Sequence, residues 1–187
     1  MNQRPLHIVL TTIFVPDVLY DYYNNFSHFG HLDDIKIWII GDRKTPARAG
    51  EIARDLTRNG LATIYLDIDA QNQWGARCPD IYQRLPFDNE TRRNIGYLCA
   101  LEDGCETLIS IDDDTYPGED DFAGNHKKTG QPWTSSLIHE PSGFYNICEH
   151  IVIEPPKPVY PRGFPFLFRN GANHPEAVTP AGDIQIG

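Results

Sequence analysis

Three consecutive carboxylates, Asp112, Asp113 and Asp114, directly follow the apolar run at residues 108–111. Adjacent negative charges repel one another unless a cation lies among them. Along an extended chain alternate side chains point the same way, so Asp112 and Asp114 would be able to share one divalent metal. Carboxylate oxygens suit Mg²⁺ or Mn²⁺, which would take phosphate oxygens as further ligands. We therefore expect a metal at Asp112 and Asp114; the alternative is an acidic turn in solvent.

Polar residues also end two earlier apolar runs. Thr11 and Thr12 close the first run, and Asp42 comes just after the second. In open α/β sheets the carboxyl ends of the strands form the edge at which ligands bind. A nucleoside diphosphate along that edge would meet Thr11 and Thr12, would donate a pyrimidine N–H to Asp42, and would reach a metal at the acidic triplet. The alternative for Asp42 is a turn residue after a strand.

Two arginines, Arg92 and Arg93, lie in the first turn of the helix predicted before the acidic triplet. Guanidinium groups pair well with phosphate oxygens, so both could reach a diphosphate. The alternative for both is ordinary exposed charge. The set expected to bind a nucleotide sugar is therefore Thr11, Thr12, Asp42, Arg92, Arg93, Asp112 and Asp113. The chain has neither the glycine-rich phosphate loop nor the dinucleotide-binding glycine motif.

The elements that would position these residues alternate along the chain. Apolar, β-branched runs predict strands at residues 6–15, 35–40, 61–68 and 108–111. The last of these is expected to be a buried central strand, because its apolar residues are nearly continuous. Helical spacing and end signals predict helices at residues 17–29, 45–60 and 88–104. The alternation predicts an α/β fold of the Rossmann-like type, with a mostly parallel sheet flanked by helices.

Some local features are less regular. Thr45 suits the N-cap of the second helix, with Pro46 at its first position. Residues 70–86 have no consistent period and predict a long loop. Residues 147–153 and 164–168 predict short strands.

Composition sets the broad class. The chain has 187 residues and 40% hydrophobic residues, which predicts one globular domain over residues 1–187. Its net charge of −10 argues against a nucleic-acid partner, because phosphate-binding surfaces need clustered Lys and Arg. No apolar run is long enough for a membrane span and no signal pattern opens the chain, so we expect a cytoplasmic protein. The four cysteines lack the spacing of a zinc site.

These residues also carry a family resemblance. The run R-R-N-I-G at residues 92–96, then Ala100 and I-S-I-D-D-D at residues 109–114, resembles the nucleotide-sugar half of GT-A fold glycosyltransferases. Within that fold the chain is most similar to the reversibly glycosylated polypeptide family, which includes UDP-arabinopyranose mutases. A later R-G-F-P-F segment at residues 162–166 adds to the resemblance, which spans roughly residues 6–172.

The resemblance implies a single GT-A-like domain and a set of roles. Asp112 to Asp114 would bind the metal, Mn²⁺ or Mg²⁺, and the diphosphate. Asp42 would bind the uracil, and Arg162 would match the arginine that becomes glycosylated, although Pro161 before it departs from the family's usual apolar residue. The expected function is metal-dependent transfer of a sugar from a UDP-sugar to an unknown acceptor.

Two alternatives stay open beside this function. One is a UDP-sugar mutase with transient self-glycosylation, and the other is a non-catalytic nucleotide-binding remnant of a transferase. Related enzymes continue beyond residues 183–187, where this chain reads like the start of a strand. A truncated or minimal form that has the donor half, with or without the catalytic base, is therefore expected. Oligomer formation is left open.

Overall fold

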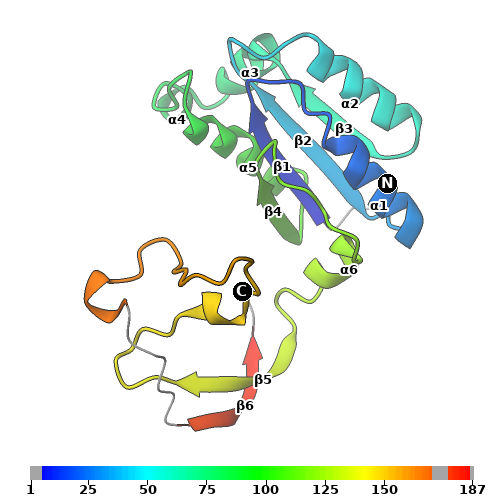
Figure 1. Cartoon of the computed structure of the whole chain (residues 1–187). Helices are drawn as coiled ribbons and strands as arrows, with labels where there is room; N and C mark the ends of the chain where they lie inside the picture. The colour runs from blue at the N-terminus through cyan, green and yellow to red at the C-terminus, as the bar shows by residue number, and fades with distance from the viewer. Residues whose placement is uncertain (1–5, 170–176, 186–187) are drawn as a thin grey trace. The chain divides into compact units, whose positions relative to one another are not determined.

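The computed structural model describes residues 6–169 and 177–185 (Figure 1). The chain divides into two compact units, Met1–Lys128 and Thr129–Gly187, and each is described by itself. The expectation that residues 1–187 form a single domain stays a prediction.

The first unit is built on a four-stranded parallel sheet, which confirms the predicted α/β, Rossmann-like fold. The strands have the spatial order β3-β2-β1-β4. Their bounds are Leu6–Thr12 for β1, Ile35–Gly41 for β2, Ala62–Leu66 for β3 and Thr107–Ile111 for β4. Within this sheet β4 is an edge strand, so the prediction of a buried central strand is wrong. Its residues are mostly half-buried and Ser110 is exposed, because only β1 pairs with it among the described strands.

Helices cover both faces of the sheet (Figure 1). Side chains of β1 and β2 alternate between the faces: Ile8 and Ile37 pack with α1 (Leu19–Phe29) and α2 (Arg48–Arg58). Val9 and Ile40 pack on the other face with α5 (Arg93–Glu102). Strands with apolar residues on both sides are what a sheet covered by helices requires. The ends of β1 and β2 are therefore held between two layers, which fixes the polar residues that follow them.

Gly96 allows α5 to lie close to the sheet. A Cβ at this position would be 2.5 Å from Val9 Cγ1 and 3.0 Å from Ile40 Cδ1. These distances are shorter than van der Waals contact, so the helix can take this position only without a side chain there. The close approach brings the start of α5, and with it Arg93, to the edge at which β1 and β4 end.

The structure corrects three local predictions in this unit. Residues 70–86 are not a loop, because α3 (Ile68–Gly75) and α4 (Pro79–Tyr82) occupy much of them, with Asp67 as the N-cap of α3. The second helix begins at Arg48 with Ala47 as its N-cap, not with Thr45. The Thr45 hydroxyl instead donates to the Thr12 carbonyl and accepts from the Asp42 N–H. The third helix begins with a separate 3₁₀ turn, η1 (Glu90–Arg92), before α5.

The rest of the chain is less regular. The first unit ends with α6 (Phe122–His126), and the second contains the antiparallel pair β5 (Pro132–His139) and β6 (Ala177–Gln185). The strands predicted at residues 147–153 and 164–168 are wrong. These segments contain the 3₁₀ turns η2 (Ile147–His150) and η3 (Phe166–Phe168), with irregular backbone after η2 and before η3. Asn146 caps η2 through the N–H of Cys148, which favours a turn over a strand.

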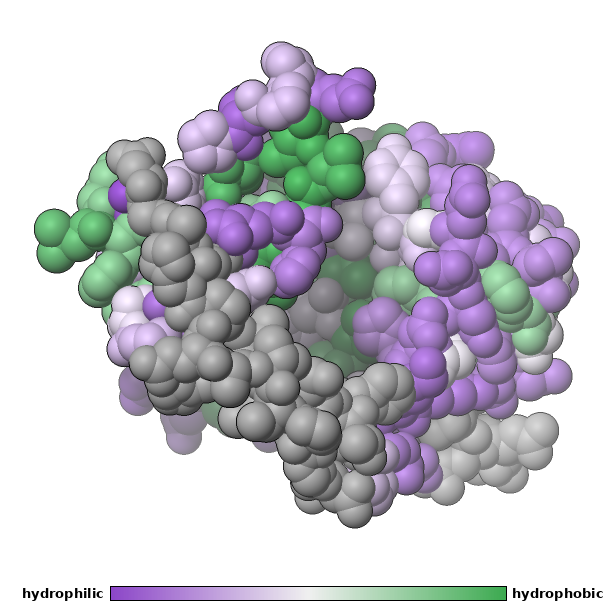
Figure 2. All heavy atoms as spheres, turned by 60° about the horizontal axis from the view of Figure 1, so that its bottom comes forward, coloured by the Kyte–Doolittle hydropathy of each residue, from purple (hydrophilic) through white to green (hydrophobic). Residues whose placement is uncertain are grey.

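Hydrophobic residues lie open to view on one face of the molecule, beside hydrophilic ones (Figure 2). Among the residues whose side-chain exposure is described, the most exposed large hydrophobic ones are Val152, Phe166 and Leu167 of the second unit. No helix within the described ranges has both the length and the apolar character needed to cross a membrane.

Candidate functional site

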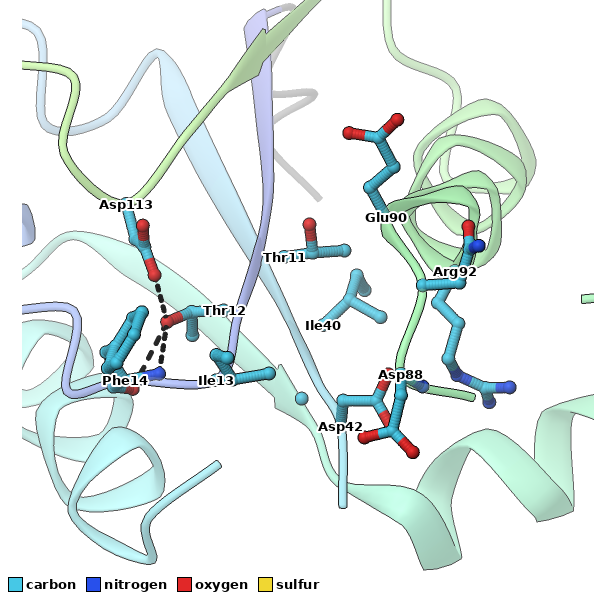
Figure 3. Close-up of a pocket in the computed structure, with 12 residues that line it drawn as sticks. Thr11, Thr12, Ile13, Phe14, Ile40, Asp42, Asp88, Glu90, Arg92 and Asp113 are labelled. Carbon is cyan, nitrogen blue, oxygen red and sulfur yellow. Dashed lines mark hydrogen bonds between the residues drawn. The ribbon is translucent and has the colours of Figure 1, made fainter. Parts of the chain in front are cut away.

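A pocket of about 270 Å³ lies where β1 and β2 end (Figure 3). Its lining comes from the ends of these strands, from the turn after β4 and from the segment that leads into α5. The lining residues are Thr11, Thr12, Ile13, Phe14, Ile40, Gly41, Asp42, Asp88, Asn89, Glu90, Arg92 and Asp113. The structure therefore brings five of the expected nucleotide-sugar residues to one pocket: Thr11, Thr12, Asp42, Arg92 and Asp113.

The pocket is closed on one side by a bond between the ends of two strands. The Thr12 hydroxyl donates to Asp113 Oδ2 (2.5 Å) and accepts from the Phe14 N–H (2.9 Å). Thr12 is buried and Asp113 is half-buried. This contact holds one carboxylate of the acidic triplet beside Thr12 in the lining of the pocket, as Figure 3 shows.

The other two carboxylates of the triplet face solvent. Asp112 to Asp114 do not continue β4 but form a turn, in which the Thr115 N–H donates to the Asp112 carbonyl oxygen. The extended geometry from which we inferred that Asp112 and Asp114 point the same way is therefore absent. Among the described residues no three His, Cys, Asp or Glu side chains are grouped as metal ligands. The metal at Asp112 and Asp114 stays a prediction.

Arg93 reaches from α5 to the acidic triplet. Its Nη2 donates to Asp112 Oδ1 (2.5 Å) and to Thr11 Oγ1 (3.3 Å), and its Nη1 donates to Ser110 Oγ (3.1 Å). Burial alone would lower the pKa of the Arg93 guanidinium, but the hydrogen bond and the charge of Asp112 hold this pKa above its usual value. The Arg93 Nε is buried and has no hydrogen-bond partner. Arg93 thus serves as counter-charge to one carboxylate of the triplet.

Asp42 holds the opposite side of the pocket. Its Oδ1 accepts from the Arg43 N–H and its Oδ2 accepts from the Asp88 N–H, both at 2.7 Å. Asp88 has φ = 54°, a left-handed conformation that costs energy in a residue other than glycine. The bond from Asp42 stabilises this conformation. Asp42 is therefore more than a turn former, because it ties the end of β2 to the segment before η1.

Arg92 occupies the interior and not the open part of the pocket. It is 1% exposed, and its Nε and Nη2 donate to Gln71 Oε1 at 2.9 and 2.5 Å. Its Nη1 donates to the Leu85 carbonyl (2.9 Å) and its Nη2 also to Tyr82 Oη (3.1 Å). In Figure 3 the guanidinium extends away from the side on which Thr12 and Asp113 lie. Surface charge, the alternative for this residue, does not describe it; contact with a diphosphate stays a prediction.

Gln71 and Asp88 are site residues that sequence reasoning missed. Gln71 is fully buried in α3, a segment predicted as a loop, and Asp88 was only the first residue of the helix predicted at residues 88–104. The sequence offers one indication of the helix that contains Gln71. Asp67 is a residue type that caps helices, and a helix starting at Ile68 would have Gln71 in its first turn. The positive φ of Asp88 has no signal in the sequence.

The charge of the pocket limits what it can bind. Four carboxylates line it, those of Asp42, Asp88, Glu90 and Asp113, against one guanidinium, that of Arg92. An anion would be repelled unless a cation accompanies it. Neutral groups that donate hydrogen bonds fit this lining without a cation, because ionised carboxylates only accept.

Arg162 is exposed and belongs to the second unit. It lies in a turn before Gly163, which has φ = 85°. Its predicted role as the glycosylated arginine stays a prediction.

Comparison with known proteins gives a partial similarity. No family model matches the chain. A segment of 78 residues is 32% identical to the probable glycosyltransferase STELLO1 of Arabidopsis thaliana, and this match covers 42% of the present chain and 9% of that protein. The finer resemblance to the reversibly glycosylated polypeptide family stays a prediction. The chain thus has the sheet and helices of an α/β, Rossmann-like fold and a distant, partial similarity to a probable glycosyltransferase.

Proposed function

We propose that this protein is a metal-dependent glycosyltransferase that takes a UDP-sugar as donor. The observation that carries the proposal is the pocket at the carboxyl ends of β1 and β2, which contains Thr11, Thr12, Asp42 and Asp113. In open α/β sheets this is the edge where nucleotides bind. The partial similarity to a probable glycosyltransferase supports the same class of reaction.

The pocket divides into two sides that suit different parts of such a donor. Asp42 and Asp88 lie on one side and Thr12 and Asp113 on the other (Figure 3). A uracil would donate its N–H to Asp42, and the diphosphate would lie toward the acidic triplet. The volume of about 270 Å³ is small for a ligand site and suits a base or a ribose, so the sugar would lie outside this pocket.

The acidic triplet suits the predicted metal by its chemistry, because Asp112, Asp113 and Asp114 offer hard carboxylate oxygens. When bound, Mn²⁺ or Mg²⁺ would neutralise the leaving diphosphate, which is a large term in catalysis of this kind. Thr12 fixes the Asp113 carboxylate by its hydrogen bond. Arg93 holds Asp112 by an ion pair, and its guanidinium is of the type that pairs with phosphate oxygens.

Calorimetric titration with UDP, with and without Mn²⁺, tests the proposal. We expect binding that requires Mn²⁺, because the carboxylate-lined pocket repels the free diphosphate. Asp113→Asn should weaken the Mn²⁺-dependent binding at least tenfold, since it removes one of the carboxylates that would attract the cation on which binding depends. Asp120→Asn is the matched control, because Asp120 is an exposed acid of the following loop whose side chain does not line the pocket. UDP binding that is equal with and without Mn²⁺ would refute the metal-dependent reaction.

A further inference from the structure

Arg92 is a buried cation whose hydrogen-bond partners are all neutral. It is 1% exposed, and it donates to Gln71 Oε1, the Leu85 carbonyl and Tyr82 Oη. The ring of Phe87 lies under the guanidinium, 3.9 Å from its Cζ to the ring centroid. Burying a charge without a carboxylate partner is costly. Such a residue is therefore a candidate for a role in the nearby site.

Gln71 connects Arg92 to the sheet. Its Nε2 donates to the Gly41 carbonyl (2.6 Å) and to the Leu66 carbonyl (2.8 Å), while its Oε1 accepts from Arg92. Both carbonyls lie at the carboxyl ends of strands, β2 and β3. Gly41 directly precedes Asp42 in the chain, so the Gln71 amide fixes the backbone from which Asp42 projects.

Arg92 also fixes the segment that precedes η1 and lines the pocket beside Asp42. Arg92 holds Leu85 by its carbonyl and Phe87 by its ring, and Asp88 follows with its N–H donated to Asp42. Asp42 is thus positioned from two directions, from β2 through Gln71 and from Asp88 through Arg92. Both carboxylate oxygens of Asp42 already accept one backbone N–H each, which sets their direction.

We propose that Gln71 and Arg92 are positioning residues that hold Asp42 as a fixed hydrogen-bond acceptor, and so make the pocket select nucleobases that carry an imide N–H. This inference rests on the proposed function and names the residues that would select the base of the donor. A carboxylate locked in place pairs with a donor and rejects a base in which that hydrogen is replaced, because its charge would be left without a partner. Arg92 then acts through Asp42 and Asp88 and not by contact with the diphosphate.

The test compares UDP with 3-methyl-UDP, which differs only in that the imide hydrogen is a methyl group. Both are titrated calorimetrically into the full chain in the presence of Mn²⁺. We expect the wild type to prefer UDP by about tenfold to a hundredfold, the effect of one hydrogen bond to a charged group. In Arg92→Gln the ratio of the Kd for 3-methyl-UDP to the Kd for UDP should fall toward one. Binding of Mn²⁺ with pyrophosphate should stay within about twofold of wild type. A merely structural role would weaken all three ligands together.

Gln71→Glu is the second variant, because loss of a buried arginine can unfold a protein. It keeps the size of the side chain and gives Arg92 an ionic partner, but it can no longer donate to the Gly41 and Leu66 carbonyls. It too should lower the ratio. Arg77→Gln is the control, since Arg77 forms an exposed ion pair with Glu102 outside the pocket and should leave the ratio unchanged.

Each outcome decides a different point. If both folded variants, checked by thermal unfolding, keep the wild-type ratio, the positioning role is overturned. If the wild type binds UDP and 3-methyl-UDP equally, the base-selecting device is overturned, while the proposed transferase function stands. If the wild type does not bind UDP at all, the proposed function itself fails.

Discussion

At the scale of single residues, Asp112 and Asp114 give the clearest test of the metal. If both bind a metal that bridges to a diphosphate, Asp112→Asn and Asp114→Asn should each abolish the rise in melting temperature caused by Mn²⁺ with UDP. A ligand at a hundred times its Kd would stabilise the wild type by about 2.7 kcal/mol. The ligand-free variants should stay folded, because both side chains are exposed and the amide oxygen of Asp112→Asn can still accept from Arg93. Thermal unfolding with and without the ligands measures both effects, and an undiminished shift in the two variants would remove the metal from the site.

The neighbours Arg92 and Arg93 show how far single residues could be predicted. The sequence placed both at the start of one helix and assigned both to the diphosphate. In the structure Arg93 lies against Asp112 and Thr11, whereas Arg92 points into the interior toward Gln71. Successive side chains of a helical turn point in different directions. Which of the two faces the site depends on the rotation of α5 on the sheet, and this is set by distant packing.

At the scale of the element, Gly96 controls the distance between α5 and the sheet. We expect Gly96→Ala to destabilise the protein by about 1–2 kcal/mol, since the overpacking against Val9 costs about 1–3 kcal/mol and outweighs the helix propensity gained. Urea unfolding measures this change. Leu101→Ala is the control on the exposed face of the same helix, where truncation should change stability little. A Gly96→Ala protein as stable as wild type would show that α5 can shift outward freely.

The contact between α6 and the segment that follows α1, which contains His31 and Asp34, should depend on pH. The pKa of Asp34 is lowered by its hydrogen bonds from Lys127 and from His31, and that of Asp121, the N-cap of α6, is lowered by the Gly124 N–H. A carboxyl whose folded pKa is below its usual value of 3.8 stabilises the fold above that value, and this stabilisation is lost as the pH falls through the folded pKa.

The corresponding variant is Asp34→Asn. It should be less stable than wild type at pH 7, because Lys127 and His31 lose the carboxylate that they share. The difference should be smaller at about pH 3, because below the usual carboxyl pKa of 3.8 the stabilisation is lost progressively as the pH falls through the lowered folded pKa of Asp34. Urea midpoints at the two pH values measure it, with Asp21→Asn, an exposed acid of α1, as control. A difference that is the same at both pH values would contradict an electrostatic origin.

The elements with a strong period were predictable and the weakly patterned ones were not. β1, β2, α1 and α5 have apolar residues at the spacing that buried faces require, and the structure has them within a few residues of the predicted ranges. The short helix α3 was missed because its buried face rests on Gln71, Trp74 and Gly75, of which one is polar and one has no side chain. The apolar residues of β4 predicted a central strand, but the position of a strand within a sheet depends on which strands pair with it.

At the scale of the whole molecule, the role of Arg162 decides between a transferase and a mutase. If the protein is a transferase as proposed, the full chain should keep its unmodified mass after incubation with a labelled UDP-sugar, because the sugar passes to an acceptor or to water. Intact-mass measurement checks this. A gain of one sugar unit that Arg162→Ala abolishes, while Arg84→Ala retains it, would favour the mutase instead. Both arginines are exposed, so neither substitution should disturb the fold.

The division of the chain into two units leads to the last prediction. The candidate pocket is lined only by residues between Thr11 and Asp113, and these belong to Met1–Lys128. Among the residues whose side-chain burial is described, 6–132 and 140–169, every buried hydrophobic side chain except Phe164 belongs to this unit too. A unit with its own core can in principle fold alone. We therefore expect a fragment of residues 1–128 to unfold cooperatively and to bind UDP with Mn²⁺ within about threefold of the full chain.

Circular dichroism melting and calorimetry on the fragment and the full chain measure this expectation. Phe164 and the antiparallel pair β5 and β6 would then serve a step other than donor binding. Because a transferase binds an acceptor as well as a donor, we would assign them to the acceptor. A fragment that melts cooperatively but has lost UDP binding would show that residues 129–187 complete the donor site. A fragment without cooperative melting would favour the single domain over residues 1–187 that the sequence predicts, because the core of the first unit would then need the second unit in order to fold.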